Sequence, residues 1–212
     1  MALNRSIYYK ERSWNDFHIY SSEILTGGVK IIQPSVYHEL RGEISTLYHK
    51  DYYDRLLPVE EREKQVEFKH DRYSKSHEGV LRGLHYDAKT WKMVSCLTGK
   101  IYLVVLDVRG GNKTKNPQYG SWETYILSPS TQTQVLIPPG FANGHYVMED
   151  NSIFYYKLAY AGEYVDENIN VIMLLNADDI PLIVDTVGNV QQLLNIMYDL
   201  CTKWGLEVSM LK

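Results

Sequence analysis

The sequence contains little cysteine: only Cys96 and Cys201 occur among its 212 residues. Both lie in apolar surroundings, and neither belongs to a Cys-x-x-Cys or Cys-x-x-x-His pattern. This spacing excludes a disulfide framework and predicts buried thiols rather than a zinc site. Thiols of this kind fit a reducing compartment, so we expect a cytoplasmic protein.

Long apolar runs and an excess of positive charge are also missing. No uninterrupted apolar stretch approaches the length of about 18 residues that a membrane span needs, and charges interrupt the segment where a signal peptide would be apolar. Lys and Arg total 22 against 26 Asp and Glu, which gives a formal net charge of -4. We therefore expect neither nucleic acid nor a membrane as a partner, while a local basic pocket for phosphate stays compatible with this balance.

Strand-forming residues are abundant. Apolar residues make up 44% of the chain, enough for one sizeable core, and 18 tyrosines accompany many β-branched runs. The turn residues of Thr98-Gly99, Arg109–Asn112 and Pro138–Gly140 separate these runs with connections short enough for hairpins. The pattern predicts an antiparallel sandwich or barrel with strands at 28–33, 91–97, 99–108, 124–127, 134–137, 144–148 and 153–160.

Helical periodicity is confined to the end of the chain. From Val190 to Trp204, apolar residues recur at steps of three and four, which predicts an amphipathic helix that Asn189 caps and Gly205 ends. The polar segment Lys50–Glu67 is interpreted as a solvated turn of helix or a surface loop.

Two segments concentrate functional side chains. The first is Phe68–Lys92, where His70 and His77, each taken by itself, are interpreted as ordinary polar or core histidines. Because Arg82 lies three residues before His85, an alternating strand turns the two to opposite faces unless a bulge intervenes, and Gly83 permits a bulge.

The second segment, 137–164, carries three neighbouring polar side chains on one predicted strand. Tyr155 or Tyr156 inside a strand is more often a core residue than a catalytic one. Lys157 is expected to face the opposite side from Tyr156.

These residues carry a resemblance to the nucleotide-sugar 3,5-epimerase family typified by dTDP-4-dehydrorhamnose 3,5-epimerase. The details HDRYSKSH, GFANGH and YYKLAYAGEY are similar to those of members that act on nucleotide-linked 4-keto-heptoses, whose nucleotide is usually GDP. The resemblance covers about residues 28–184 and rests on four runs in the family's order: Ser74–Arg109, Tyr119–Trp122, Leu136–His145 and Phe154–Tyr160.

The resemblance implies an all-β fold, a cupin-type antiparallel jelly roll spanning 28–185, after an N-terminal extension (1–27) and before the C-terminal helix (186–212). It implies an isomerase that inverts C3, C5 or both of a GDP- or dTDP-linked 4-keto sugar in the synthesis of cell-surface polysaccharide precursors. The ketone acidifies the neighbouring hydrogens, so a neutral imidazole can remove one while the enolate oxygen is stabilised.

The family's roles fall on particular residues of this chain. By position, His85 matches the base, Tyr156 the acid on the opposite face, and Lys92 the cation that stabilises the enolate. Arg82 matches a residue at the pyrophosphate or keto oxygen. Further substrate contacts are expected from Asn143, His70, Tyr160 and Arg41, the last across a homodimer interface.

The sequence also departs from the family. Asn143 replaces a histidine of the family's GFAHG run, which puts inversion at both carbons in doubt, and Thr46 replaces a glutamate, which argues against thymine. The family's base-orienting aspartate run is missing after residue 184, and Asp178, Asp179 and Asp185 are interpreted as turn residues.

The His-x-His spacing of metal-binding cupins is absent as well, so we expect no metal and no organic cofactor. Two alternatives stay open: a sugar-nucleotide 3,4-ketoisomerase, and a non-catalytic carbohydrate-binding relative.

Overall fold

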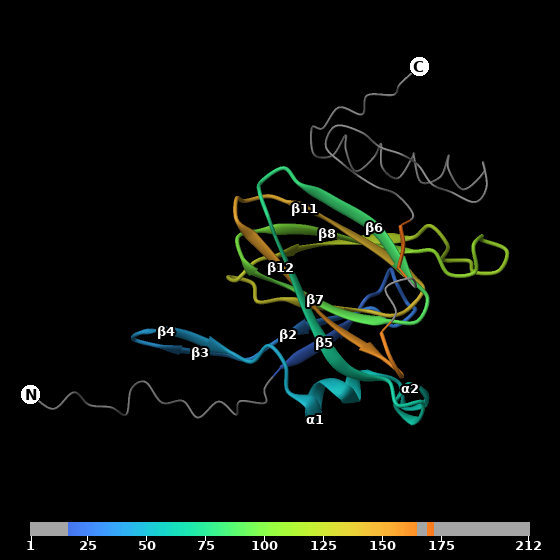
Figure 1. Ribbon diagram of the computed structural model, residues 1–212, viewed down its shortest axis with the longest axis horizontal. Helices are drawn as coiled ribbons and strands as arrows, with labels where there is room; N and C mark the ends of the chain where they lie inside the picture. Colours follow the sequence, from blue (N-terminus) through green and yellow to red (C-terminus); the bar gives the residue numbers. More distant parts are fainter. Residues whose placement is uncertain (1–16, 165–168, 172–212) are drawn as a thin grey trace, which may run out of the picture.

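Two antiparallel sheets face each other in the computed structural model, which describes residues 17–164 and 169–171 (Figure 1). The six-stranded sheet has the order β1 (His18–Ser21), β2 (Lys30–Gln33), β10 (Gln134–Ile137), β7 (Trp91–Thr98), β12 (Ser152–Tyr160) and β5 (Glu67–Ser76). The five-stranded sheet has the order β13 (Ile169–Val171), β6 (Leu81–Asp87), β11 (Phe141–Val147), β8 (Ile101–Asp107) and β9 (Trp122–Leu127). The all-β antiparallel prediction is confirmed.

The main core lies between the two sheets. On β7, Val94 and Cys96 turn inward at alternate positions, and on β8 every second residue from Ile101 does the same. The Cys96 thiol is free and buried, as predicted, whereas Cys201 and the expected C-terminal helix lie outside the described residues. This core fills one part of the sandwich, and both polar and apolar side chains line the cavity beside it.

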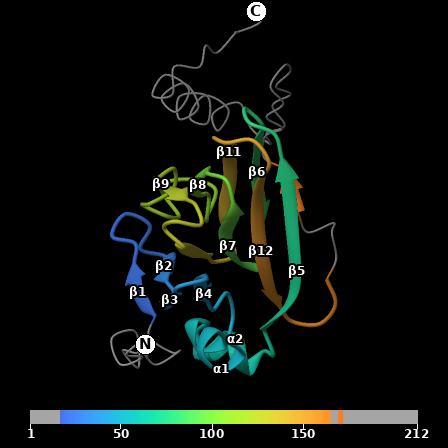
Figure 2. The ribbon, with the colours of Figure 1, turned by 90° about the vertical axis from the view of Figure 1, so that its left-hand side faces the viewer.

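A second core covers the outer face of the six-stranded sheet. It is closed by α1 (Lys50–Tyr53), the short 3-10 helix η2 (Asp54–Leu56) and α2 (Val59–Glu63), which lie beneath the sheet in Figure 2. Tyr53, Leu56 and Leu57 are buried there against β7 residues such as Trp91. The interpretation of segment 50–67 as solvated is therefore wrong for these apolar residues. Burial of each such side chain contributes about 1.5–3 kcal/mol to the stability of the fold, which favours the buried position.

The connections between strands differ from the hairpins that the turn residues predicted. Only the Arg109–Asn112 turn lies between neighbours that pair, β8 and β9. The turns at Thr98-Gly99 and Pro138–Gly140 instead lead from the six-stranded sheet to the five-stranded one. The same types of turn residue occur in a hairpin within one sheet and in connections between the two sheets. The local sequence therefore does not determine which sheet the next strand joins.

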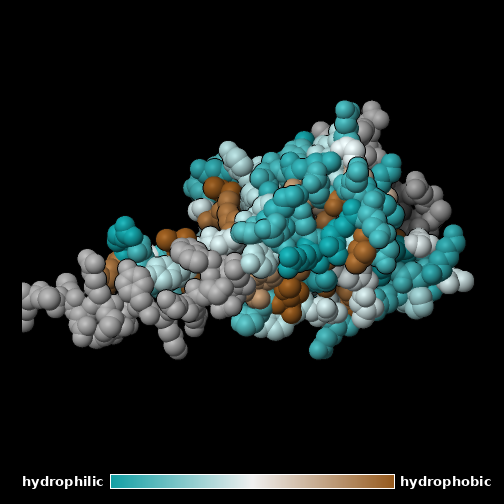
Figure 3. Space-filling view, turned by 90° about the horizontal axis from the view of Figure 1, so that it is seen from below, coloured by the Kyte–Doolittle hydropathy of each residue, from teal (hydrophilic) through white to brown (hydrophobic). Residues whose placement is uncertain are grey.

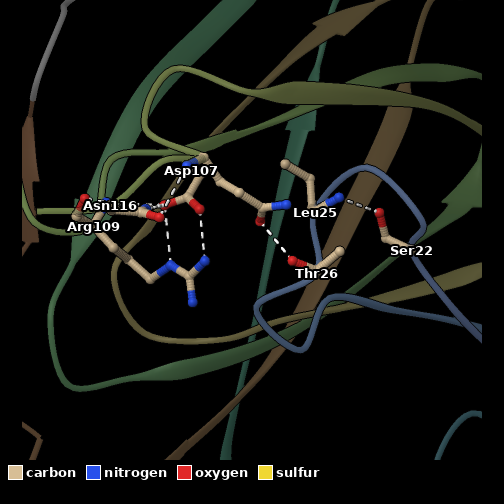
Figure 4. Close-up of polar contacts among 7 residues, drawn as sticks. Ser22, Leu25, Thr26, Asp107, Arg109 and Asn116 are labelled. Atoms are coloured by element: carbon tan, nitrogen blue, oxygen red, sulfur yellow. Dashed lines mark hydrogen bonds and ion pairs between the residues drawn. The ribbon is translucent and has the colours of Figure 1, made fainter. Parts of the chain in front are cut away.

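A cluster of hydrogen bonds fixes the long connection between β8 and β9 (Figure 4). Both oxygens of the Asp107 carboxylate accept hydrogen bonds from the Arg109 guanidinium, at 3.0 and 2.6 Å, and Asn116 Nδ2 donates to Oδ1 at 3.0 Å. Thr26 Oγ1 also donates to Gln118 Oε1 at 2.8 Å, which ties the loop after β1 to this connection.

The strands β3 (Val36–Glu39) and β4 (Gly42–Ser45) form a hairpin of their own that projects from the sandwich as an arm (Figure 1). Apolar side chains are exposed on it, including Leu40 with 87% of its surface accessible and Ile44. Ile19 and Tyr20 are likewise exposed on β1, the edge strand of the larger sheet. Figure 3, with the arm at the left, shows apolar surface on the arm.

The expected division into extension, domain and terminal helix stays a prediction. Part of the expected extension joins the fold, since β1 pairs with β2 and Leu25 is fully buried in the main core.

Candidate active site

A cavity of about 210 Å³ lies between the sheets, beside the main core. Five strands and the segment after β12 contribute its walls, which bring together side chains that are far apart in the sequence. Five of the eight predicted site residues line it: His85, Tyr156, Lys92, Arg82 and Asn143. The other lining residues are Ser74, Val94, His145, Phe154, Leu158 and Tyr164.

A bulge in β6 allows Arg82 and His85 to share the cavity. Opposite them on β11, His145 pairs with Arg82 and Asn143 with His85, so three steps along β6 match two steps along β11. Gly83 lies within the bulge with a φ of +133°, and a Cβ there would come within 2.5 Å of the Gly144 Cα. The bulge that the sequence permitted is therefore present, and it requires glycine.

The alternation of β12 selects one of two adjacent tyrosines. Phe154, Tyr156 and Leu158 line the cavity. Tyr155 and Lys157 turn to the other face, where the Tyr155 hydroxyl donates to Asp71 Oδ1 at 2.9 Å and Lys157 Nζ pairs with the same oxygen. Tyr156, and not Tyr155, is thus the residue whose hydroxyl belongs to the cavity wall, and Lys157 lies on the opposite face as predicted.

His85 is an uncharged imidazole at neutral pH. Burial lowers its pKa from 6.5, and the neighbouring positive charges of Lys92 and Arg82 lower it further. Its Nδ1 atom is buried and finds no hydrogen-bond partner within residues 17–164 and 169–171. An imidazole in this state has a nitrogen lone pair available for a proton.

Two cations reach the cavity from different sheets. Lys92 Nζ, on β7, donates to Asn143 Oδ1 at 3.3 Å, and burial lowers the pKa of this lysine while Asp87 acts in the opposite direction. Arg82 Nε donates to Ser76 Oγ at 3.1 Å, and Ser76 is itself buried on β5. Each of these two hydrogen bonds goes to a neutral polar group, so neither bond neutralises the charge of the cation.

The remaining three predicted site residues lie away from the cavity walls. The His70 ring is 5.0 Å from the ring of Tyr164 and 6.4 Å from that of Tyr160. Tyr160 lines a neighbouring hollow of about 690 Å³, and Tyr164 lines both. Arg41 is exposed at the tip of the arm, where it forms an ion pair with Glu39 at 2.7 Å.

Sequence reasoning missed His145 as a cavity residue. It follows Asn143 by two positions on β11, so strand alternation places both on one face. The spacing of two residues from Asn143 could therefore have predicted that His145 faces the same cavity. Ser76, which holds Arg82, shows the same alternation with Ser74 on β5.

Metal and membrane signals are both lacking in the described ranges. Residues 17–164 and 169–171 contain no group of three or more His, Cys, Asp or Glu side chains placed to hold a metal ion. Within the same ranges, no helix is both long and apolar enough to span a membrane.

Known proteins are similar to this chain in sequence and in fold. The family model described as dTDP-4-dehydrorhamnose 3,5-epimerase matches residues 24–186. A dTDP-4-dehydrorhamnose 3,5-epimerase from Shigella flexneri is 35% identical over 132 residues, which is 61% of this chain and 68% of the relative.

Among solved structures, a dTDP-6-deoxy-D-glucose-3,5-epimerase from Legionella pneumophila in complex with dTDP-4-keto-L-rhamnose aligns with a TM-score of 0.63 at 34% identity, covering 79% of this chain and 85% of that one. A dTDP-4-dehydrorhamnose 3,5-epimerase from Bacillus anthracis with TDP and pyrophosphate bound aligns with a TM-score of 0.63 at 25% identity, covering 81% of this chain and 93% of that one. These matches confirm the expected cupin-type jelly roll.

Proposed function

The chain belongs to the dTDP-4-dehydrorhamnose 3,5-epimerase family, and from this membership we propose how its own residues carry out the reaction. It is an isomerase that epimerises a nucleotide-linked 4-keto sugar. The observation that supports our assignment most strongly is the meeting of uncharged His85, the cation Lys92 and the hydroxyl-bearing Tyr156 in one cavity.

His85 is the base that removes the proton from the carbon next to the ketone. Its lowered pKa keeps the ring unprotonated at neutral pH, so a proton can be accepted at once. The electron pair of the broken C–H bond moves into an enolate, and the ketone oxygen takes up the negative charge. Lys92 faces this charge, with Asn143 holding its ammonium group.

Tyr156 is the acid that returns a proton to the same carbon. His85 reaches the cavity from β6 of the five-stranded sheet, and Tyr156 reaches it from β12 of the six-stranded sheet. A sugar ring held between the sheets therefore meets the base on one face and the phenol on the other. Protonation from the second face reforms the ketone with inverted configuration.

Arg82 binds the pyrophosphate of the nucleotide. A guanidinium matches two phosphate oxygens at once, and the contact with Ser76 Oγ fixes its orientation. His70 and Tyr160 bind substrate farther out, through the aromatic cluster that they form with Tyr164 beside the cavity.

Arg41 completes the site of a partner subunit in a homodimer. Within one chain it lies at the tip of the projecting arm, and the exposed apolar side chains of the arm and of edge strand β1 supply a surface for a second copy. Edge strands of this kind pair readily with another chain.

The nucleotide carrier and the cellular location complete the proposal. We assign a GDP or dTDP carrier to the sugar, and thermal shifts with GDP, UDP, CDP and dTDP decide between them, since a bound nucleotide raises the melting temperature. The free, buried thiol of Cys96 supports a cytoplasmic location. Precursors of cell-surface polysaccharides are the expected products.

Replacing each adjacent tyrosine by phenylalanine tests the acid. In heavy water, Tyr156→Phe is expected to keep exchange of the substrate hydrogen but to lose inverted product, because only reprotonation needs the hydroxyl. Tyr155→Phe, whose hydroxyl contacts Asp71 on the other face, is the matched control and keeps full turnover. Normal product formation by Tyr156→Phe would remove this residue from the mechanism.

Mixed dimers test the shared site. His85→Asn and Arg41→Ala are each expected to abolish or strongly reduce activity. Co-expression of the two restores about a quarter of wild-type activity, because random pairing makes half of the dimers hybrid and one site in each hybrid is intact. No restoration, or a monomer in light scattering with full activity, contradicts the assignment.

A further inference from the structure

We propose that His145 is an additional substrate-binding residue, whose imidazole hydrogen-bonds a hydroxyl group of the sugar ring. This inference rests on the proposed function, since it places the sugar in the cavity between the sheets. It concerns a residue that lies two positions beyond Asn143 on the same face of β11.

The position of His145 supports a ligand contact. The residue lines the cavity, and only 5% of its surface is accessible. Its Nε2 atom is buried and has no hydrogen-bond partner in the described part of the chain. Buried ring nitrogens in folded proteins are nearly always hydrogen-bonded, so a ligand that fills the cavity is the natural partner for this atom.

The ring is held in a fixed orientation. It stacks on Phe154, which comes from the opposite sheet, with ring centroids 4.1 Å apart and an angle of 22° between planes. A stacked ring loses little further conformational freedom when a ligand arrives, so the hydrogen bond forms at a low entropic cost.

The charge state of His145 identifies the kind of ligand group. Burial, the positive charge of Arg82 and, at the low pH where His85 is itself protonated, repulsion from that ring lower its pKa to about 3. The ring is therefore neutral under physiological conditions and offers one N–H donor and one acceptor nitrogen. A neutral donor and acceptor suits a hydroxyl group, which both accepts and donates.

The other polar groups of the sugar nucleotide already have partners of matching charge. The pyrophosphate is matched by the guanidinium of Arg82, and the keto oxygen by the ammonium of Lys92, which bonds Asn143 and not His145. Of the remaining polar groups of a sugar ring, the ring oxygen can only accept a hydrogen bond, whereas the hydroxyls both donate and accept, as the neutral imidazole does. His145 thus contributes to recognition of the sugar rather than to binding of the nucleotide.

Paired binding measurements test this directly. Calorimetry gives the Kd of dTDP against dTDP-glucose, and of GDP against GDP-mannose, and the pair that binds more tightly is used. In His145→Phe, which keeps an aromatic ring for the stack on Phe154, we expect the nucleotide sugar to bind about tenfold more weakly, the effect of one lost hydrogen bond. The Kd of the free nucleoside diphosphate should stay within twofold of wild type.

Two further variants separate this role from a structural one. His145→Gln, whose amide can occupy the place of Nε2, should recover part of the lost affinity. Tyr146→Phe alters the neighbouring residue, which points to the other face of β11, and should bind like wild type. Equal weakening of sugar nucleotide and free nucleotide in His145→Phe, or no weakening of either, overturns the inference. Absence of solvent exchange by the wild-type enzyme would instead count against the proposed function.

Discussion

The bulge at Gly83 turns the side chains of Arg82 and His85 to the same side of β6. Replacement of Gly83 by alanine therefore gives a quantitative prediction. A methyl group at Gly83 would have to tolerate a φ of +133° and a distance of 2.5 Å to the Gly144 Cα. The backbone conformation alone costs about 1–3 kcal/mol for a residue with a side chain. Overpacking against rigid backbone adds about 1–3 kcal/mol.

Together these terms reduce the free energy of unfolding of Gly83→Ala by about 2–6 kcal/mol, a large share of the stability of a typical domain. The matched control is Gly79→Ala, at a φ of +82° with open space around the added methyl group. It bears only the conformational cost, about 1–2 kcal/mol. Urea denaturation measures both variants, and activity is measured at low temperature on the folded fraction.

In folded Gly83→Ala, kcat/KM should fall at least about tenfold, because a displacement of the base of about 1 Å already costs up to a hundredfold in rate. Gly79→Ala should keep wild-type kcat/KM. If the two variants unfold at the same urea concentration, the close approach of the two glycines does not constrain the strand, and the explanation of the shared cavity fails.

Three further predictions concern the cavity. The acid limb of the pH profile of kcat/KM should lie below pH 6.5, because burial and the charges of Lys92 and Arg82 lower the pKa of His85 in the folded protein. Activity is then lost only as the pH falls through that lowered pKa. An acid limb centred above pH 6.5 contradicts this prediction. Ser76→Ala should raise KM about fivefold with kcat nearly unchanged, since it removes one hydrogen bond of about 1 kcal/mol that orients Arg82; an unchanged KM shows that Ser76 does not orient this side chain. Wild type should exchange solvent deuterium at one carbon, with C3 expected, and only slowly at the other, whereas Asn143→His raises the slower rate; equal exchange at both carbons in wild type refutes this role of Asn143.

The strand pattern of the sequence was sufficient to predict the all-β fold but not the assignment of strands to sheets. Alternation shows which residues share a face, so it separated Tyr156 from Lys157 correctly. Alternation contains no information on the partner strand. The sequence therefore did not predict that two of the turns connect strands of different sheets. The short strands β1, β3, β4 and β13 lack a long alternating run and were not predicted. The longer strands β5 and β6 were not among the predicted strands either, because charged and polar residues dominate their sequences.

The resemblance to the epimerase family supplied the candidate site residues, and a local rule accounts for how two of them reach one cavity. Gly83 permitted a bulge, and the structure uses it to unite Arg82 with His85. The hydrogen bonds of Arg82 to Ser76 and of Lys92 to Asn143 join residues from different strands, so only the fold could reveal them. The apolar residues of α1 and η2 lie among charged residues in the sequence, so their burial was not predicted. It depends on the face of the sheet that these helices cover.

Solvent deuterium exchange tests most directly whether His85 removes the proton next to the ketone. Wild type and His85→Asn are incubated in heavy water with a nucleotide-linked 4-keto sugar on the carrier that the thermal shifts identify, and NMR locates the deuterium. We predict deuterium on a carbon beside the ketone with wild type and none above the uncatalysed rate with His85→Asn, while the nucleotide Kd of the variant is unchanged. Exchange at the wild-type rate in His85→Asn would contradict the account.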